Sequence, residues 1–462
     1  MSDITCISPV DGREYIRRKA AGDAEITAAL SAARAAQKEW ARLPVEARAA
    51  YCTAAVDAML AMEHDITPEL AWQMGRPVRY GAGELRGFSE RARYMIAIAG
   101  EALADIAPEP KPGFIRRIKR VPVGVVLTVA PWNYPYLTAV NSIIPALMAG
   151  NAVILKHAAQ TLLVGERFAR AFEAAGLPDG LFHNLVLTHD AAAKLIAARG
   201  VDHVCFTGSV AGGRAVERAA AGAFIGAGLG LGGKDPAYVR ADAAFDHAVE
   251  NIVDGAFFNS GQSCCGIERV YVAAPLFDRF VEAAAALTKG YVLGDPLNEA
   301  TTLGPMARPG FADLVRAHTD EALGRGARAH IDPKAFKADR LGTPYLAPQI
   351  LTNVDHTMKV MSEESFGPVV GVMKVSGDEE AVRLMNDSRY GLTASVWTSD
   401  ADAAMRIADQ LETGTVFMNR ADYLDPALAW TGVKDSGRGA SLSRVGYESL
   451  TRPKSYHLRT AV

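Results

Sequence analysis

Apolar residues recur at helical spacing through the first hundred positions of the chain. Positions three or four residues apart are apolar over 23–40, which predicts an amphipathic helix, and the same spacing predicts further helices over 46–62 and 84–99. Prolines and a glycine between residues 108 and 113 end the pattern, because neither residue type continues a helix readily. We therefore expect the N-terminal part to be mainly helical.

After Val121 the pattern changes from helical spacing to continuous apolar runs. The run over 123–129 is typical of a strand that is buried on both faces of a parallel sheet. Helical stretches separate it from further predicted strands over 152–155, 185–187 and 203–206. Strands that alternate with helices predict a parallel sheet, which binds ligands at the carboxyl ends of its strands. A second α/β segment is expected over 233–432.

Two polar, partly alternating segments differ from the buried strands. Residues 114–120 and 454–459 carry several arginines and lysines, and both alternate in the way an edge strand does. Edge strands of this kind are normally paired or covered. We expect the two segments to combine in a small β element that is exposed or paired with a partner chain.

The bulk composition is that of an ordinary globular protein. The chain has 462 residues, 49% hydrophobic and 22% charged, and a net charge of −3 without an extended basic block, which argues against nucleic acid as a partner. No apolar run reaches the ~18 residues that span a bilayer, and residues 1–6 do not resemble a secretory signal. Five cysteines, two of them adjacent, are typical of reduced thiols, so we predict a cytoplasmic protein without a membrane partner.

Cys264 is the most informative single residue. A thiol between small and polar residues, just after the Gly261-Gln262 turn, is interpreted as a nucleophile, although free cysteines are more often buried structural residues. The adjacent Cys265 is interpreted as a packing residue or a spare thiol. Upstream, the amide of Asn133 either donates to a reacting oxygen or caps the following helix. The ten histidines form no His-Glu-x-x-His motif and no Cys-x-x-Cys is present, so no metal centre is predicted.

Four motifs, taken in order along the chain, resemble those of the aldehyde dehydrogenase superfamily. They are Pro131-Trp132-Asn133, Phe206-Thr207-Gly208-Ser209, Leu231-Gly232-Gly233-Lys234 and the run that ends in Cys264. Matches over 8–14, 363–368 and 430–437 extend the resemblance to essentially the whole chain. The resemblance implies an α/β fold with two parallel-sheet domains, a Rossmann-like cofactor domain and a catalytic domain, plus a small β oligomerisation element.

The resemblance also implies domain boundaries and an assembly. The dinucleotide-binding domain would comprise residues 1–103 and 123–232, the catalytic domain residues 233–435, and the oligomerisation element residues 104–122 and 436–462. The chain would form a homodimer or homotetramer. Its activity would be the NAD(P)-dependent oxidation of a small-molecule aldehyde to a carboxylic acid.

Each motif residue takes a role from the resemblance. Cys264 is implied to be the nucleophile, and the Asn133 amide with the Cys264 backbone N–H is implied to stabilise the tetrahedral oxygen. The implied cofactor contacts run from the adenine ribose at Lys156, past the pyrophosphate at the helix start near Ser209, to the nicotinamide ribose at Glu364. The implied cofactor-binding residues are Pro131, Trp132, Lys156, Thr207, Gly208, Ser209, Gly213, Leu231, Glu364 and Phe366.

The sequence departs from the family at the position that activates water. Hydrolytic members carry a glutamate directly before Leu-Gly-Gly-Lys, where this chain has Gly230, and a second acid found in some members is matched by Ser441. Because a general base is typically worth ~10²–10⁴-fold, we expect impaired deacylation. Three explanations stay open: an introduced substitution that traps the acyl-enzyme, acyl transfer to coenzyme A, or another base. A non-catalytic protein that keeps the fold is a further alternative.

A second departure concerns the nicotinamide cofactor. Many NAD-preferring members carry a glutamate three residues after the lysine that corresponds to Lys156, and this chain has Ala159 there. NADP therefore stays open, and His157 would contact a 2′-phosphate if it were protonated. NAD is slightly favoured because no arginine stands beside Lys156. The candidate residues for the aldehyde channel, whose aromatic rings favour an apolar or aromatic aldehyde, are Tyr134, Phe258, Ser263 and Tyr423.

Overall fold

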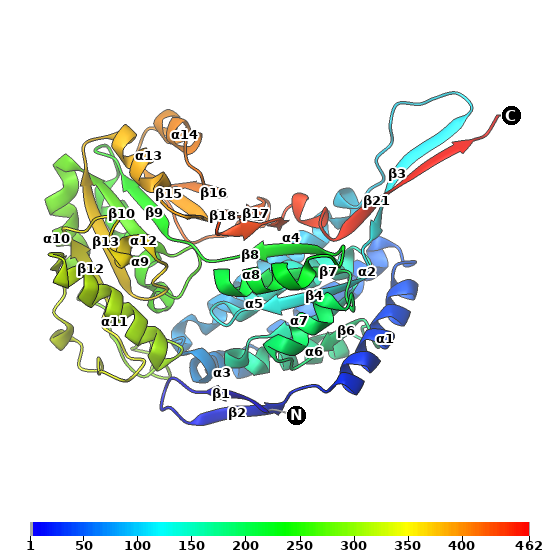
Figure 1. Ribbon diagram of the computed structural model, residues 1–462, viewed down its shortest axis with the longest axis horizontal. Coiled ribbons are helices and arrows are strands. Elements are labelled where there is room, and N and C mark those ends of the chain that lie inside the picture. The colour runs from blue at the N-terminus through cyan, green and yellow to red at the C-terminus, as the bar shows by residue number, and fades with distance from the viewer. Residues whose placement is uncertain (1–2, 462) are drawn as a thin grey trace.

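The computed structural model describes residues 3–461 and consists of two α/β bodies and a projecting arm (Figure 1). Each body is built on one sheet with helices packed against it. The two sheets are joined by a short link that follows β8 (Gly226–Gly230) and precedes β9 (Asp235–Val239). This link, residues 231–234, carries the Leu-Gly-Gly-Lys motif, so the motif lies between the two bodies.

The first sheet has six strands in the order β19-β8-β7-β4-β5-β6, and all pairings except that of β19 are parallel. Its remaining strands are β4 (Val125–Ala130), β5 (Ala152–His157), β6 (Phe182–Asn184), β7 (His203–Thr207) and β19 (Gly437–Arg438). Val125, Val126 and Leu127 are fully buried, as the apolar run predicts. The strand order reverses between β4 and β7, and α/β sheets bind ligands beside such a reversal, at the carboxyl ends of the strands.

Helices from the N-terminal part and from the crossovers cover this six-stranded sheet. They are α1 (Asp23–Trp40), α2 (Val45–Leu60), α3 (Glu63–Met74), α4 (Gly81–Ala102), α5 (Pro135–Met148), α6 (Leu162–Ala174), α7 (His189–Ala197) and α8 (Val210–Ala220). α1 and α5 both contact β4 and β5, and α4 packs along α5. All of these helices contribute to one hydrophobic cluster, which includes Trp40, Phe88 and Phe168.

The second sheet has seven strands in the order β11-β12-β13-β10-β9-β15-β16, and only β11 is antiparallel to its neighbour. Its strands other than β9 are β10 (Ile267–Ala273), β11 (Arg328–Ala329), β12 (Gln349–Thr352), β13 (Val369–Val375), β15 (Thr393–Trp397) and β16 (Thr415–Met418).

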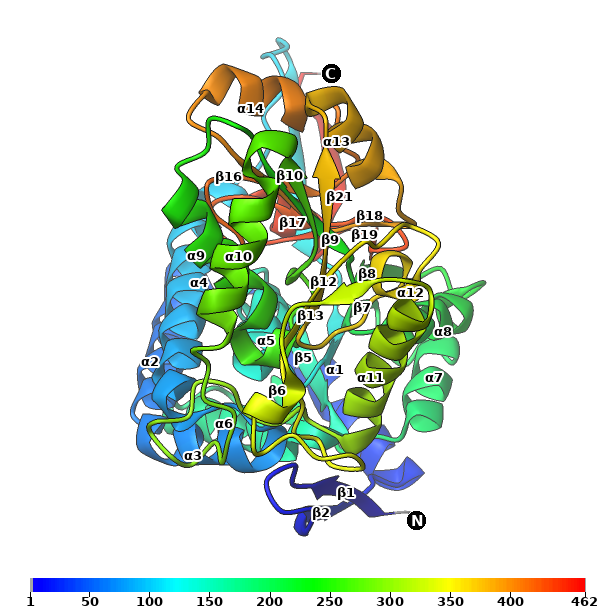
Figure 2. The ribbon, with the colours of Figure 1, turned by 90° about the vertical axis from the view of Figure 1, so that its left-hand side faces the viewer.

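Alternation along β9 divides the second body into two hydrophobic clusters. Ala237 and Val239 pack on the face covered by α9 (Phe245–Phe257) and α10 (Phe277–Thr288). Tyr238 packs on the opposite face, and Figure 2 shows α10 and α11 on opposite sides of the sheet. The helices of that opposite face are α11 (Pro309–Gly324), α12 (Lys359–Ser362), α13 (Asp378–Asn386) and α14 (Ala401–Ala408).

The arm is a two-stranded antiparallel ribbon that extends away from the first body (Figure 1). It consists of β3 (Phe114–Pro122) and β21 (Thr451–Arg459), paired without interruption along both strands. The two segments expected to form a small β element therefore pair with each other. Ile115 and Leu458 lie opposite one another in this ribbon, and both are about half exposed.

Three short antiparallel pairs complete the strands. They are β1 (Asp3–Ile7) with β2 (Glu14–Lys19), β14 (Tyr390–Gly391) with β18 (Val433–Lys434), and β17 (Trp430–Thr431) with β20 (Ala440–Ser441). Two of these strands, β1 and β2, precede the first helix, so the expectation of a mainly helical N-terminal part missed them. It also missed α3 between the second and third predicted helices.

The strand predicted over 185–187 is wrong by three residues, because the paired segment is β6, Phe182–Asn184. Leu185 and Leu187 are buried in the core, which explains their apolar character. Leu185 N–H still donates to the Leu155 carbonyl of β5 at 2.9 Å. After it, the carbonyl of Val186 accepts a hydrogen bond from Ala21 N–H, 2.8 Å away. Burial beyond the end of the paired segment therefore produced the same apolar pattern as a strand.

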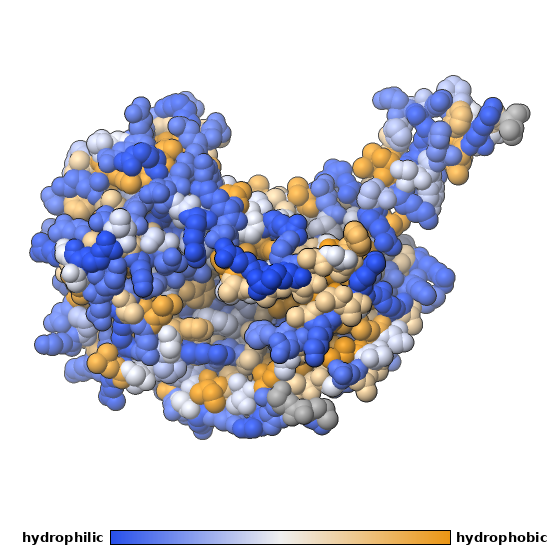
Figure 3. All heavy atoms as spheres, viewed as in Figure 1, coloured by the Kyte–Doolittle hydropathy of each residue, from blue (hydrophilic) through white to orange (hydrophobic). Residues whose placement is uncertain are grey.

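The surface in view is largely hydrophilic, with apolar residues scattered over both bodies (Figure 3). Within residues 3–461, none of the helices combines the length and the apolar character that crossing a bilayer would require.

Candidate functional site

Cys264 lines a cavity of about 320 Å³ between the two bodies. It lies on the segment that leads from α9 through the 3₁₀ turn Phe258–Gly261 to β10. The cavity wall also includes Thr207 and Gly230 from the first body. Cys264 is partly exposed, whereas the neighbouring Cys265 is buried. The predicted nucleophile is thus the cysteine of the pair that a ligand can approach.

The turn before Cys264 is held in an unusual backbone conformation. Asn259 and Ser260 have φ values of 55° and 57°, in the left-handed region that side chains other than glycine rarely adopt. The Asn259 side chain donates to the carbonyls of Asn133 and Gln262, both at 3.2 Å. Gln262 Oε1 accepts from Ala307 N–H at 2.8 Å. These buried hydrogen bonds stabilise the turn and so position the thiol.

Asn133 lies directly beside this turn. Its side chain is 4% exposed, and Nδ2 donates to the Gln262 carbonyl at 3.2 Å, two residues before Cys264. An amide group carries two N–H donors, so one bond to Gln262 leaves the second N–H for another acceptor. α5 begins two residues after Asn133, with Tyr134 between them as its N-cap, and no side chain caps it. The helix-cap interpretation of Asn133 is therefore wrong, because the amide faces the cysteine loop.

A buried ion pair supports the backbone of Asn133, and the sequence alone did not indicate this pair. Arg76 and Glu84 form this pair, and both are almost fully buried. Arg76 Nη2 donates to the Asn133 carbonyl at 2.6 Å, while Glu84 Oε1 accepts from the Tyr136 and Leu137 N–H groups at 2.9 and 3.0 Å. Removing one partner of such a pair would leave an uncompensated buried charge. No local sequence pattern indicates that Arg76 and Glu84 contact the segment that begins at Asn133, more than 40 positions away.

Asp422 contacts the residues on both sides of Cys264. Its Oδ1 accepts from the Ser263 hydroxyl at 3.0 Å and from the Cys265 thiol at 2.8 Å. Asp422 has a φ of 50°, which aspartate tolerates better than most side chains. It lines the same cavity as Cys264 and Gly230. The sequence reasoning did not single out this residue, because 157 positions separate it from Cys265.

Glu364 reaches the link between the two bodies. Its Oε1 accepts from Gly233 N–H at 3.1 Å, and a Cβ placed on Gly232 would lie only 2.2 Å from its carboxylate. Glycine at 232 therefore permits the close approach. Burial first, and then the nearby Glu268, raise the pKa of Glu364 to about 8.

Lys234 and Glu268 form a buried ion pair that supports the Glu364 loop. Glu268 accepts from Ser365 N–H at 2.8 Å and from Phe366 N–H at 2.9 Å. The Lys234 ammonium also donates to Ser365 Oγ at 3.2 Å. Lys234 was part of a recognised motif, but its role as a support for the loop was not predicted.

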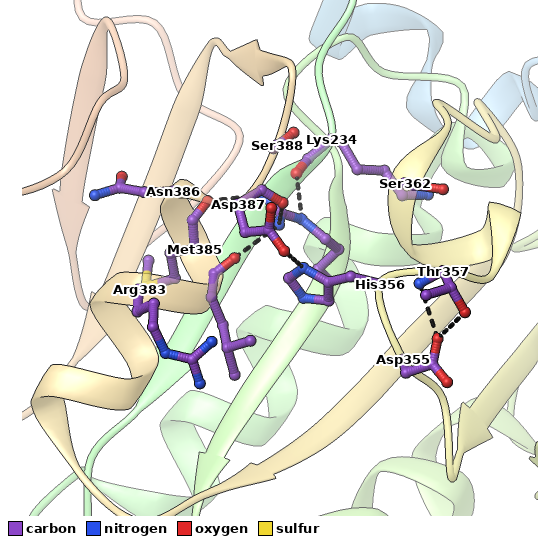
Figure 4. Close-up of polar contacts among 12 residues, drawn as sticks. Lys234, Asp355, His356, Thr357, Ser362, Arg383, Met385, Asn386, Asp387 and Ser388 are labelled. Carbon is purple, nitrogen blue, oxygen red and sulfur yellow. Dashed lines mark hydrogen bonds and ion pairs between the residues drawn. The ribbon is translucent and has the colours of Figure 1, made fainter.

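A second polar network fixes the backbone of Lys234 from the side of the seven-stranded sheet. Arg269 Nε donates to the Lys234 carbonyl at 2.8 Å, and its Nη1 lies 3.2 Å from the Tyr271 hydroxyl. That hydroxyl lies 2.8 Å from His356 Nε2. The other ring nitrogen of His356, Nδ1, lies 2.7 Å from the Asp387 carboxylate, and Figure 4 shows this contact. Burial lowers the pKa of His356 despite this carboxylate. The network ties the link to α13.

Aromatic contacts join the loop after β4 to the Glu364 loop. The ring of Trp132 lies edge-on to Phe366, with ring centroids 5.7 Å apart, and stacks on Phe311 at 5.4 Å. Trp132 therefore lies beside Phe366. Such ring pairs add to the stability of the contact beyond the area they bury.

The loop between β7 and α8 has the form of an anion site. Ser209 is the N-cap of α8, and its Oγ accepts from Gly212 N–H at 3.2 Å. The free N–H groups at a helix start favour a bound anion such as a pyrophosphate. A Cβ on Gly213 would lie 2.5 Å from the Leu231 side chain, so glycine there lets α8 pack against the link.

Lys156 lies at the end of β5 and is only 6% exposed. Burial alone lowers its pKa, and no carboxylate within residues 3–461 is among the causes of that shift. A buried ammonium group without a counter-ion is costly unless a ligand supplies one. The features at Lys156, α8 and Glu364 together fit a dinucleotide that runs along the carboxyl ends of the strands.

His157 does not face a phosphate as a cation. Its ring Nδ1 accepts from Ala158 N–H at 2.9 Å, and Nε2 lies 3.3 Å from the Pro135 carbonyl. Burial lowers its pKa to about 4, so the imidazole is neutral near pH 7. The condition under which His157 would contact a 2′-phosphate, a protonated ring, is therefore not met near pH 7.

Gly230 is the last residue of β8 and lies opposite Gly437 of β19. A Cβ placed on Gly230 would have Thr207 Oγ1 as its nearest neighbour, at 3.6 Å, which is ordinary van der Waals contact. Ser441 lines the same cavity. Of the four proposed channel residues, Tyr134, Phe258 and Ser263 line the cavity, whereas Tyr423 does not and instead donates to Glu90 at 2.6 Å.

Comparison with known sequences gives one consistent result. The sequence model of the aldehyde dehydrogenase family matches residues 1–456. The chain is 34% identical over 459 residues to 3,6-anhydro-alpha-L-galactose dehydrogenase of Streptomyces coelicolor, covering 99% of this chain and 93% of that protein. It is 31% identical over 455 residues to succinate-semialdehyde dehydrogenase [NADP(+)] of Mycobacterium avium, covering 98% and 96%.

Solved structures agree with the sequence comparison. An NAD-dependent aldehyde dehydrogenase from Sinorhizobium meliloti superposes with a TM-score of 0.94 at 30% identity, covering 100% of this chain and 92% of that chain. An NADP-dependent enzyme from E. coli gives a TM-score of 0.94 at 27% identity, covering 99% and 95%. These neighbours include proteins described with either cofactor.

Proposed function

Because the chain belongs to the aldehyde dehydrogenase family, a family of NAD(P)-dependent enzymes, we propose that it oxidises its aldehyde through a thioester on Cys264. The observation that carries this proposal is the position of the Cys264 thiol, partly exposed in a cavity and beside the buried amide of Asn133. The carboxylic acid would be the product, formed when the thioester is hydrolysed.

The residues around Cys264 account for the chemistry in a defined order. The Cys264 thiolate adds to the aldehyde carbon and forms a tetrahedral thiohemiacetal. The Asn133 amide and the Cys264 backbone N–H stabilise the negative oxygen of that intermediate. The nicotinamide, when bound, supplies the acceptor for the hydride that leaves this carbon. Glu364 holds the nicotinamide ribose, with Pro131, Trp132, Leu231 and Phe366 around it, while Thr207, Gly208, Ser209 and Gly213 hold the pyrophosphate.

The experiment that tests this proposal is rapid mixing of the protein with a panel of aldehydes and either cofactor. We expect a burst of reduced cofactor of about one equivalent per active site, followed by slow turnover. Mass spectrometry of the quenched sample should show the acyl adduct on Cys264. A protein that gives neither an absorbance burst nor an adduct with any aldehyde would contradict the proposal.

Acyl transfer to coenzyme A is a second candidate, favoured by the glycine at 230. Transfer to an external thiol needs no base that activates water, so the missing glutamate would not matter. If this reaction occurs, adding coenzyme A should convert the slow phase into rapid turnover with acyl-coenzyme A as product. Hydrolytic turnover that coenzyme A does not change would exclude it.

For the cofactor we propose that both NAD and NADP bind, with NAD slightly preferred. A glutamate three residues after Lys156 would repel a 2′-phosphate, but this chain has the uncharged Ala159 there. No carboxylate is among the causes of the pKa shift of Lys156. His157 supplies no positive charge for a phosphate near pH 7, because burial lowers its pKa to about 4. Lys156 would therefore be the main cation for the ribose hydroxyls or the phosphate.

Replacing Lys156 by alanine should separate the two cofactors. We expect the KM for NADP to rise by about ten- to a hundredfold, because a hydrogen bond to a charged group is lost, and the KM for NAD to rise less. The measurement is the initial rate of cofactor reduction as a function of the concentration of each cofactor. Lys194→Ala, which removes an exposed lysine of α7, is the matched control and should change neither constant. Equal effects on both cofactors would show that Lys156 does not reach the phosphate.

We also propose that the arm mediates assembly into a homodimer or homotetramer. The projecting element is shorter than the expected ranges 104–122 and 436–462. β19 lies in the six-stranded sheet, and Leu442, Tyr447 and Leu450 belong to the core of the first body. The arm itself is β3 with β21. The remaining proposed division, a dinucleotide-binding domain over 1–103 and 123–232 and a catalytic domain over 233–435, follows the two sheets.

Removing residues 455–462 should weaken assembly. This truncation deletes more than half of β21 and leaves most of β3 without its partner strand. We expect a smaller particle by light scattering on a sizing column, with the burst amplitude per chain retained. Removal of 460–462 alone, which leaves β21 whole, is the control. An unchanged particle mass after the longer truncation would refute a role of the arm in assembly.

A further inference from the structure

We propose that the cavity beside Cys264 holds the tail of an elongated aldehyde that carries uncharged hydroxyl groups, and that Asn141 and His203 bind these hydroxyl groups. This inference rests on the proposed function, because it names the class of aldehyde that would react with Cys264. The glycines at 228 and 230 provide the space for the tail. The glycine at 230 would thus have a role in substrate binding, besides leaving the chain without a base at that position.

The cavity continues from Cys264 along one face of the first sheet. β7 and β8 are paired in register, so that Thr207 lies opposite Gly230 and His203 lies opposite Gly226. Side chains alternate between the two faces of a strand, so positions 226, 228 and 230 share one face. Gly228, Gly230, Thr207 and His203 all line the cavity. Successive glycines on this face leave a groove where another strand would carry side chains.

The groove is open over two of these glycines and closed over the third. The nearest atoms to a Cβ on Gly230 or Gly228 would be 3.6 Å and 4.0 Å away, respectively. A Cβ on Gly226 would lie 2.5 Å from His203 Nδ1, so the imidazole fills this space and forms the end of the groove. Two residues of a parallel strand span about 7 Å, so the groove takes a tail of about that length beyond Gly230.

One face of α5 forms the opposite wall. Four of its residues line the cavity at the spacing of one helix face, namely Leu137, Thr138, Asn141 and Ser142. Thr138 Oγ1 donates to the Tyr134 carbonyl at 2.7 Å. Ser142 Oγ lies 3.0 Å from Thr128 Oγ1. Asn141 Oδ1, in contrast, is buried and has no hydrogen-bond partner among the described residues.

His203 is the second polar group of the groove that lacks a partner within residues 3–461. Its Nε2 is buried, and the residue is only 4% exposed. Burial, followed by the charge of Arg438, lowers the pKa of His203 to about 4, so the imidazole is neutral near pH 7. A neutral imidazole has one donor and one acceptor nitrogen, and Asn141 Oδ1 is an acceptor. Hydroxyl groups both donate and accept, so they pair with both residues and remove the cost of leaving them unpaired.

The two positions at which the sequence departs from acidic residues of the family are Gly230 and Ser441, and both line this cavity. Their small side chains leave room and add no negative charge. Because any side chain at 230 would enter the groove, variants at this position are best assayed with short aldehydes.

The charged residues of the cavity do not favour an anionic tail. Asp254 and Asp422 both line it and would repel a carboxylate. Arg438 lines it too, but this arginine already pairs with Glu217 at 2.8 Å. Arg91 also lies in the wall, so a carboxylate-ended ligand is included in the experiment as the competing case.

Binding of unreactive amides tests the groove without catalysis. The native full-length protein would be titrated in a calorimeter with hexanamide, with ω-hydroxyhexanamide and with adipic acid monoamide, in which the amide carbonyl stands in for the aldehyde. We expect the hydroxyl group to strengthen binding by about tenfold over hexanamide, because it pairs buried groups that otherwise have no partner. The carboxylate-ended amide should bind more weakly than the hydroxyl-ended one.

Two variants assign this preference to the groove. Asn141→Leu keeps nearly the same size without hydrogen-bonding atoms, so the tenfold preference should fall to about twofold or less while hexanamide still binds. Its melting temperature should not fall, because a buried polar atom without a partner is removed. Gly228→Ala places a methyl group in the groove and should weaken binding of both hexanamides. Gly100→Ala, at an exposed position of α4 with no atom within 4 Å of the added Cβ, is the matched control.

Three results would overturn the proposal. They are equal binding of hexanamide and ω-hydroxyhexanamide to the native protein, a hydroxyl preference that survives in both Asn141→Leu and Gly228→Ala, and tightest binding of the carboxylate-ended amide, which would assign the tail to Arg91. Failure of the proposed function is a separate result. It would appear as the absence of a burst of reduced cofactor with every aldehyde, ω-hydroxyhexanal included, and would leave the binding of the amides unchanged.

Discussion

Replacing Gly230 by glutamate is expected to raise steady-state aldehyde oxidation by about 10²- to 10⁴-fold, the range typical of a general base. The cavity can accept the side chain, because a Cβ at this position would meet nothing closer than Thr207 Oγ1 at 3.6 Å. Its φ is not in the left-handed region, so the backbone is not strained by the change. The new carboxylate would share the cavity with Cys264 and could activate water against the thioester.

The measurement for Gly230→Glu is the burst and the steady-state rate in the same experiment. The burst amplitude should stay the same and only the slow phase should become faster, because the variant acts after the thioester has formed. Gly230→Gln has nearly the same size without a proton acceptor, so it should give no gain. If the glutamate variant also stays slow while the acyl adduct persists, water activation is not what limits this chain.

Replacing Cys264 by alanine is expected to abolish the burst of reduced cofactor, with a loss of about 10⁴-fold or more in turnover, as for other nucleophiles that act as part of a catalytic unit. No thioester can form without the sulfur, so the acyl adduct should also disappear. Cys264 is partly exposed and its loss removes one atom from a cavity wall, so we expect the melting temperature to change little.

Cys205→Ala is the matched control for this variant. Cys205 lines the same cavity, and burial raises its pKa to about 12, so it should not form a thiolate near pH 7. Its replacement should leave the burst and the adduct in place. A burst that survives in Cys264→Ala but disappears in Cys205→Ala would show that the nucleophile is Cys205 on β7.

Much of the candidate site could be predicted from the sequence, because its residues lie where the local pattern of apolar residues changes. Asn133, Lys156 and Ser209 each follow the end of a predicted strand, and the carboxyl ends of parallel strands meet at one edge of a sheet. The four motifs, in their order along the chain, then pointed to Cys264 as the candidate nucleophile. The missing glutamate at Gly230 was visible in the same way, since it depends only on the residue at a known place in a motif.

The sequence alone thus indicated the alternation of strands and helices in the two α/β segments, the candidate nucleophile Cys264 and the glycine at 230, because these depend on neighbours in the chain. Only the tertiary structure decided which distant groups meet. Arg76 supports Asn133, Glu268 holds the Glu364 loop and Asp422 contacts Cys265, each across a separation that leaves no periodic signal. Burial, which determines whether His157 carries a charge, likewise depends on packing rather than on the adjacent residues.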